Sequence, residues 1–313
     1  MENITKLIKK DRPNIRDITL KNYTRYLQTI LNGVESKDIN IVKKFDKIKP
    51  FLESKKMSVR KALTASILVY LRAENEEKNK DIIDKYRIYL LDLNKKYTKD
   101  KSDREKDERE NNNWATLEEL HKIRQKLHKK VVEENIPVQE TLSNKEKDLL
   151  QQYLVASLYT LLPPRRNIYS SVNVITLQEY NKLKGDELKK NYLVFNKPKT
   201  KIFFHFGKQK SKNFTKPQKI EVTKELKKVI KLYLKHHEGN ALLKNKKGER
   251  MTENGLTKYL NKVFKIGNKK ISSSMIRKIF ASEVVGKAHE LIEETAEKMG
   301  HSVATQKSNY VKK

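Results

Sequence analysis

Residues 95–113, with the sequence KKYTKDKSDREKDERENNN, carry almost no apolar side chains within a chain of 313 residues. A segment of this composition has too little apolar surface to join a core, so it interrupts any single folding unit. The composition predicts a flexible linker or a solvated helix end. We therefore expect two domains, over 1–94 and 114–313, each long enough to bury a core of its own.

The residues before this segment show helical patterning. Apolar side chains recur at helical spacing from Leu20 to Leu31, with Asp17 or Thr19 as the candidate N-cap and Gly33 as the stop. Further helical patterns cover 41–52, 59–71 after the candidate cap Ser58, and 82–93. The first domain is predicted to be entirely helical.

The residues after the segment combine helices with a few strands. A helical pattern covers 114–132, and Ser143 with Glu146 forms a capping-box signature ahead of a long apolar helix that ends at Pro163 and Pro164. Three short runs rich in aromatic and β-branched residues predict a three-stranded antiparallel sheet, over 192–195, 202–206 and 220–222. Helical patterns then return over 226–234, 256–264, 275–285 and 291–299. The expected fold class is mainly α with a small antiparallel sheet, an α+β fold.

The net charge indicates a polyanionic partner. Lys and Arg number 70 against 39 Asp and Glu, which gives a formal charge of +31 spread along the whole chain. Neutralising phosphates releases counterions and rewards each added cation, so nucleic acid is favoured over an anionic membrane.

Several classes of protein are not expected. The most apolar stretches, 62–71 and 154–162, are shorter than the roughly 18 residues that a membrane span requires, and no signal peptide is apparent, so we expect an intracellular protein. There are no cysteines, and the seven histidines show no metal-ligand spacing. The sequence predicts neither a metal nor a cofactor.

The most specific motif lies at the end of the chain, MGHSVATQKSNYVKK, where Tyr310 follows His301 by nine residues. This spacing resembles the end of the catalytic domain of tyrosine recombinases, the integrase family. The resemblance implies an Arg just after a long apolar helix, and PPRRNIYSSV supplies Arg165 and Arg166. Register favours Arg165, because apolar residues then follow at four and seven positions. The Pro-Pro-Arg-Arg form resembles the variant carried by large DNA viruses and their virophages.

The family also has a Lys in the turn that joins the second and third strands, often followed by Thr or Ser. Lys210 with Ser211 matches best. Lys199 with Thr200 is a rival in the preceding turn, and Lys208 and Lys212 are also near.

A second Arg is expected three residues after a His. The segment SSSMIRKIF gives Arg277, with Ser274 in the place of that His. A serine can donate a hydrogen bond to a phosphate oxygen but does not titrate near neutrality. Lys210 or His301 would then have to carry any proton transfer assigned to that position.

The resemblance assigns a role to each of these residues. Tyr310 would attack a DNA phosphodiester and form a 3′-phosphotyrosyl link, with Arg165 and Arg277 gripping the non-bridging oxygens. Lys210 would protonate the departing 5′-hydroxyl, and His301 would hydrogen-bond the phosphate. The link retains the free energy of the phosphodiester, so rejoining requires neither ATP nor metal.

The family also implies an architecture. The helical first domain resembles a core-binding domain that clamps double-stranded DNA, and four protomers would act as a homotetramer on two duplexes. Relatives pass a segment beyond the Tyr to a neighbouring protomer, whereas only Val311–Lys313 follow Tyr310. That exchange is therefore absent, or uses another segment, or the chain is truncated.

Two alternative functions stay open at this point: a type IB topoisomerase-like enzyme that reseals the same duplex, and a non-catalytic basic DNA-binding protein. The host nucleus, a cytoplasmic virus factory and the bacterial cytoplasm are all open as the place of action.

Overall fold

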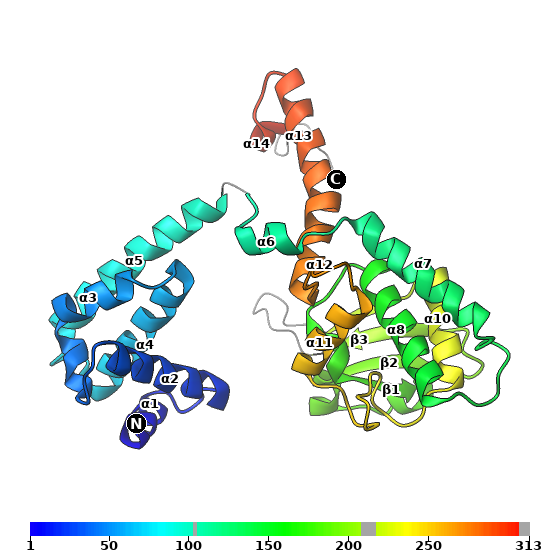
Figure 1. The fold of residues 1–313 in the computed structure, drawn as a ribbon, viewed down its shortest axis with the longest axis horizontal. Helices are drawn as coiled ribbons and strands as arrows, with labels where there is room; N and C mark the ends of the chain where they lie inside the picture. The colour runs from blue at the N-terminus through cyan, green and yellow to red at the C-terminus, as the bar shows by residue number, and fades with distance from the viewer. Residues whose placement is uncertain (103–104, 208–216, 307–313) are drawn as a thin grey trace. The chain divides into compact units, whose positions relative to one another are not determined.

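The computed structural model describes residues 1–102, 105–207 and 217–306 and divides the chain into two compact units, Met1–Glu105 and the chain from Lys106 onwards (Figure 1). The division falls within the segment 95–113. The first part of that segment continues helix α5, Lys80–Ser102, and its last part forms helix α6, Glu108–Asn113. The Asp107 side chain accepts from the Glu110 N–H and caps α6.

All the regular secondary structure described in the first unit is helical. Its elements are α1 Glu2–Asp11, α2 Asp17–Gly33, the 3-10 turn η1 Ile39–Lys43, α3 Phe45–Glu53, α4 Met57–Asn75 and α5. Helix α4 contacts α1, α2, α3 and α5, and its Ile67 and Leu71 side chains are fully buried. Tyr86 of α5 is also buried and donates its hydroxyl to the Val42 carbonyl at 2.8 Å. The core of this unit therefore surrounds α4.

Several predicted helix boundaries in this unit are wrong. The helix expected over 41–52 is interrupted at Lys44, because Asp38 accepts from the Asn40 N–H and starts a tight 3-10 turn. Helix α2 begins at Asp17 after Arg16, so neither Asp17 nor Thr19 is its N-cap, although it does end at Gly33. Ser58 lies inside α4. Helix α1, at the start of the chain, was not predicted.

The second unit contains the sheet. Its remaining elements are α7 Leu117–Glu133, α8 Asn144–Thr160, η2 Asn167–Ser171, β1 Val172–Thr176, α9 Leu177–Tyr180, η3 Gly185–Lys189, β2 Asn191–Phe195, β3 Ile202–Phe206, β4 Gln218–Glu221, α10 Lys224–Lys235, α11 Glu253–Val263, α12 Ser273–Phe280, η4 Ala281–Gly286, α13 Lys287–Lys298 and α14 Val303–Thr305.

Helix α8 forms the centre of this unit. The predicted capping box is confirmed, since Ser143 accepts from the Glu146 N–H while the Glu146 carboxylate accepts from the Ser143 N–H. Its last three turns are almost wholly buried, and it packs against α7, α10 and α11. No helix within the described ranges is long and apolar enough to cross a membrane.

The sheet has the order β1-β2-β3-β4, which confirms the α+β class and corrects the sheet topology. The three predicted strands are present and antiparallel, but β1 adds a parallel strand beside β2. Strand β1 depends on distant partners: the Val174 N–H bonds the Asn240 carbonyl at 2.8 Å, and the Leu242 N–H bonds the Val172 carbonyl at 3.0 Å. Such non-local pairing leaves no signal within a five-residue run.

Apolar clusters cover both faces of the sheet. Leu193 and Phe204 face the main core, whereas Val194 and Phe203 belong to a smaller cluster with Tyr180. Strand β3 is consequently buried along its whole length.

The end of the described chain forms a helical arm, which we define as residues 281–306. The backbone stays helical from α12 through the π-helical segment η4 into α13, so the helices predicted over 275–285 and 291–299 are joined. Figure 1 shows α13 and α14 extending beyond α12. The arm exposes the large apolar side chains Val284, Val285, Leu291 and Met299.

Candidate active site

Arg165 lies just beyond the end of α8, after Pro163 and Pro164 have ended the helix. Its guanidinium carbon lies 4.1 Å from the centroid of the Phe206 ring, and Nη2 donates to Oε1 of Gln218 at 2.6 Å. Burial lowers the pKa of the Arg165 guanidinium, yet an arginine keeps its proton in proteins. The side chain is thus a half-buried cation held in one orientation.

Both partners of Arg165 flank the same connection between strands. Phe206 is the last residue of β3, Gln218 is the first of β4, and the two face each other in the strand register. The segment 208–216 joins them, and it carries Lys210, Ser211, Lys208 and Lys212, which lie outside the described residues. The residue that ends β3 and the residue that begins β4 are therefore the two that contact the Arg165 guanidinium.

Gly207 allows the end of β3 to pass close to its neighbour. A Cβ at this position would lie 2.0 Å from the Leu188 carbonyl oxygen, and the Gly207 N–H bonds the Lys190 carbonyl at 3.1 Å. Only a residue without a side chain fits this approach.

Aromatic rings form the bed beneath the Arg165 guanidinium. Tyr169 is fully buried, with edge contacts to Tyr159, Phe204 and Phe206 at centroid distances of 5.4, 5.6 and 6.0 Å. Burial raises the pKa of Tyr169, and the charge of Arg165 opposes that rise. The Tyr169 hydroxyl has no hydrogen-bond partner among the described residues. These aromatic rings lower the local dielectric on one side of the Arg165 guanidinium. The lower dielectric strengthens the attraction of the guanidinium for an anion on its other side.

Arg166 points elsewhere. Its side chain is exposed, whereas its carbonyl accepts a 3.3 Å hydrogen bond from the Tyr159 hydroxyl. The two tandem arginines therefore differ in environment, and the half-buried one is Arg165.

Lys199 lies in the β2–β3 turn, with φ of 68°. Its ammonium donates to the Leu234 carbonyl near the end of α10 at 3.4 Å. This turn precedes Ile202, at the opposite end of β3 from Phe206, and five strand residues span roughly 13–17 Å. The structure does not bring Lys199 to Arg165.

Ser274 and Arg277 lie one turn apart on the exposed face of α12. The opposite face carries Met275, Ile276 and Ile279, which are buried in the core of the second unit. The Ser272 side chain accepts from the Met275 N–H and caps the helix. The Ser274 hydroxyl and the Arg277 guanidinium consequently lie together on the solvent-exposed face of a helix whose other face is buried in the core.

His301 follows α13 through a glycine C-cap. Gly300 has φ of 71°, its N–H bonds the Glu297 carbonyl at 2.9 Å, and the His301 N–H bonds the Ala296 carbonyl at 3.0 Å, which is a Schellman motif. Nδ1 of His301 lies 3.2 Å from the Met299 carbonyl oxygen.

The arm separates His301 from Arg277. Helical backbone runs from Arg277 to Lys298, and at 1.5 Å per residue these positions are about 30 Å apart. The structure therefore does not bring His301 beside Arg277. Tyr310 lies outside the described residues.

Sequence reasoning missed Phe206 and Gln218 as partners of Arg165. The start of the third strand was predicted at residue 220, whereas β4 begins at Gln218. The sequence did offer one signal for Phe206 and Gln218, because both lie beside the lysine-rich segment 208–216. In the described part of the chain, no three His, Asp or Glu side chains gather as a metal site would require.

The comparisons with known proteins found little. No protein-family model matches the chain, and no curated protein matches it. Among solved structures, the chain is similar to the crystal structure of XerA recombinase, with a TM-score of 0.34 and 13% identity over 98% of this chain and 92% of that chain. A likeness this distant carries no argument about function.

Proposed function

We propose that this chain is a DNA strand-breaking and rejoining enzyme of the tyrosine recombinase kind, with Tyr310 as its nucleophile. One observation carries the proposal. The half-buried Arg165 guanidinium is fixed by Phe206 and Gln218, the residues between which the lysine-rich sequence of 208–216 connects β3 to β4. The motif around His301 and Tyr310 supplies the remaining part of the argument.

The environment of Arg165 suits a phosphodiester in its transition state. In that state, negative charge builds on the non-bridging oxygens, and preorganised donors stabilise the charge without reorganising. Within the described residues, hydrogen bonding of Arg165 to Gln218 occupies Nη2, and its other N–H groups can bind two phosphate oxygens.

The lysine of the β3–β4 turn is the proposed general acid. Lys210 follows Gly207 by three residues, and three extended residues span at most about 11 Å, so its chain is tethered to the end of β3 that contacts Arg165. The Lys199 ammonium, by contrast, bonds a carbonyl near the end of α10. These observations favour the β3–β4 turn over the β2–β3 turn as the source of the acid.

The proposed reaction is a transesterification. The Tyr310 phenol gives up its proton to His301 as its oxygen forms a bond to phosphorus. The bond from phosphorus to the 5′ oxygen breaks, and Lys210 donates a proton to that oxygen, which leaves as the free 5′-hydroxyl. Arg277 would supply a second guanidinium, and Ser274 would donate its hydroxyl to a phosphate oxygen. His301 would complete the phosphate contacts.

His301 and Tyr310 need the arm to reach this site. The first residues of the arm are held against the start of α7, since the Glu283 carboxylate accepts a hydrogen bond from the Leu117 N–H at 2.7 Å. Beyond Glu283 the π-helical segment ends at Gly286, and π-helical turns and glycines are common places for a helix to bend. We propose a bend between Val284 and Gly286 when DNA is bound.

Double-stranded DNA is the proposed partner, with the first unit as its clamp. Exchange between two duplexes requires several protomers, and the homotetramer belongs to the proposal. The exposed Leu291 and Met299 offer apolar surface for contacts between copies.

Covalent trapping tests the proposal. The full chain is incubated with a library of nicked duplexes of random sequence, denatured, and separated from DNA that is not covalently attached. We expect an adduct that Tyr310→Phe abolishes and that Tyr23→Phe, a matched change in the first unit, leaves intact.

The products separate the alternatives. Joined strands from two duplexes support recombination, whereas relaxation of a supercoiled plasmid without joined products would mean a topoisomerase. DNA binding without an adduct on any library member would overturn the enzymatic proposal.

A further inference from the structure

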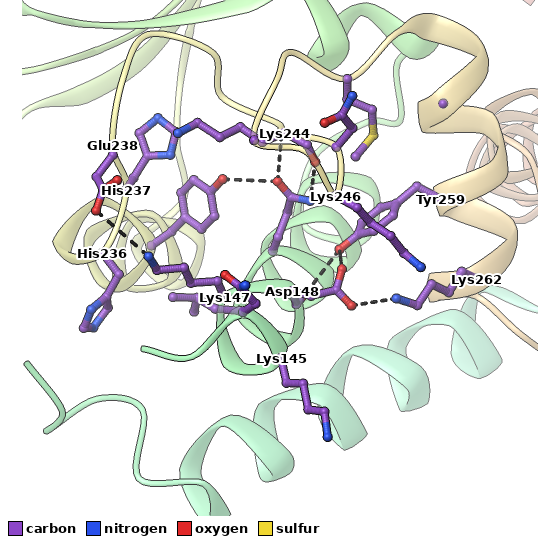
Figure 2. Close-up of a pocket in the computed structure, with 18 of the residues that line it drawn as sticks. Lys145, Lys147, Asp148, His236, His237, Glu238, Lys244, Lys246, Tyr259 and Lys262 are labelled. Atoms are coloured by element: carbon purple, nitrogen blue, oxygen red, sulfur yellow. Dashed lines mark hydrogen bonds and ion pairs between the residues drawn. The ribbon is translucent and has the colours of Figure 1, made fainter. Parts of the chain in front are cut away.

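A pocket of about 840 Å³ lies in the second unit, between the N-terminal half of α8, the end of α10, the 242–251 hairpin and α11 (Figure 2). Lysines from all of these elements except α10 line it: Lys145, Lys147, Lys244, Lys246, Lys258 and Lys262. The pocket flanks the N-terminal half of α8, whereas Arg165 follows its C-terminal end, and the 17 residues of α8 span about 25 Å. It is therefore separate from the candidate active site.

The carboxylates of the pocket are already paired. Asp148 lies 2.6 Å from the Lys262 ammonium, and Glu238 lies 4.0 Å from that of Lys147. Although burial acts to raise it, the hydrogen bonds from Lys262 and Tyr259 hold the pKa of Asp148 below its usual value.

Four lysines lack such compensation among the described residues. They are Lys145, Lys244, Lys246 and Lys258, for which no ion pair is found in that part of the chain. Burial, together with the charge of Lys244, lowers the pKa of the neighbouring His237 to about 4. His237 is thus neutral at pH 7, and the pocket has an excess of positive charge without it.

The floor of the pocket is rigid. Gln151 is buried, donates through Nε2 to the Lys244 carbonyl at 3.0 Å and accepts from the Lys244 N–H at 2.9 Å. Tyr233 donates its hydroxyl to the Leu242 carbonyl at 2.7 Å, and its ring stacks on His237 with centroids 5.1 Å apart. These contacts pin the hairpin to α8 and α10, so the pocket is formed before any ligand binds.

We propose that this pocket binds a small polyphosphate, a compact molecule with two or more linked phosphate groups. Ammonium groups bind phosphates as point charges, and clustered phosphates neutralise several of them at once. A volume of 840 Å³ falls within the usual range for small-ligand pockets. Figure 2 shows Lys244 and Lys246 among the residues that line the pocket, together with His237 and Tyr259. A hollow with an aromatic floor fits a compact ligand better than an extended nucleic-acid backbone.

The source of the phosphates is open to direct measurement. Inorganic tripolyphosphate presents the phosphates alone, and ATP presents the same phosphates with a ring that can lie on the Tyr233 and His237 floor. Both are titrated into the full chain by calorimetry at physiological salt, with sulfate at equal ionic strength as the reference anion.

The hairpin itself offers a matched control. Lys246 lines the pocket, whereas the adjacent exposed Lys247 does not. We expect the double variant Lys244→Gln with Lys246→Gln to weaken binding at least tenfold, and Lys247→Gln to leave it unchanged. Lys258→Gln, on α11, provides an independent variant with the same expected direction.

Each outcome bears on the proposal. Equal affinity for tripolyphosphate and ATP supports a site that binds the phosphates alone. Tighter binding of ATP supports a site that also contacts the adenine ring. No binding of either probe beyond that of sulfate would overturn it. So would an equal loss in Lys247→Gln, or a double variant that loses affinity for a short DNA duplex but not for ATP.

Discussion

Phe206 and Gln218 face each other across the β3–β4 ladder, and both hold the guanidinium of Arg165. A shift of β4 by one residue against β3 would turn the Gln218 side chain to the opposite face of the sheet, away from Phe206. The orientation of the Arg165 side chain therefore depends on the backbone pairing of β3 with β4, and the sheet holds the candidate site rigid.

Removal of the Gln218 amide should impair the proposed site without unfolding the protein. Gln218 is a half-buried residue of an outer strand, so Gln218→Ala should change stability little, while the Arg165 guanidinium loses the hydrogen bond that orients it. We expect covalent adduct formation to slow by about tenfold. Rates with the nicked duplex library measure the effect.

Gln152→Ala is the matched control. Its side chain donates to Asp148 at 2.8 Å on α8, away from Arg165, and adduct formation should keep its normal rate. Equal slowing in both variants would contradict a specific role for Gln218.

A methyl group at position 207 should destabilise the second unit. In Gly207→Ala the new Cβ would lie 2.0 Å from a backbone oxygen, so the end of β3 has to move away from η3. We expect a loss of about 1–3 kcal/mol in the free energy of unfolding. Urea unfolding monitored by circular dichroism measures it, and unchanged stability would contradict this packing.

The sequence predicted much of the fold because the decisive signals were local. The capping box at Ser143 and Glu146 and the alternating runs of β2 and β3 lie within a few residues of one another. Strand β1 was missed because its partners lie near residues 191 and 241. The break at Lys44 was missed because Val42 and Ile48 are both buried, which keeps the apolar spacing helix-like through a 3-10 turn.

The candidate site was only partly predictable for a similar reason. Arg165, Arg277 and His301 follow from short motifs, and the structure describes all three. The Phe206 and Gln218 contacts depend on strand register, and the position of His301 depends on whether one helix continues into the next. No short motif encodes either relationship.

Gly286→Ala tests the proposed bend in the arm. Gly286 has helical φ of −58°, and nothing lies within 4 Å of an added Cβ, so alanine should stabilise the helix by about 0.5–1 kcal/mol. If the arm bends there to bring Tyr310 to Arg165, a stiffer helix should lower adduct formation several-fold. A variant with higher helix content and unchanged adduct yield would show that the arm acts without bending.

Acid should destabilise the second unit through His237. Burial, together with Lys244, lowers the pKa of this imidazole to about 4 in the folded chain, against about 6.5 when unfolded. Between these values the unfolded chain binds a proton that the folded chain does not, so stability falls as pH drops from 6.5 to 4. His237→Gln should flatten this dependence in urea unfolding at pH 4.5, 5.5 and 7. His128→Gln, which alters an exposed histidine of α7, should retain the wild-type slope, and a wild-type slope in His237→Gln would assign the acid sensitivity to other groups.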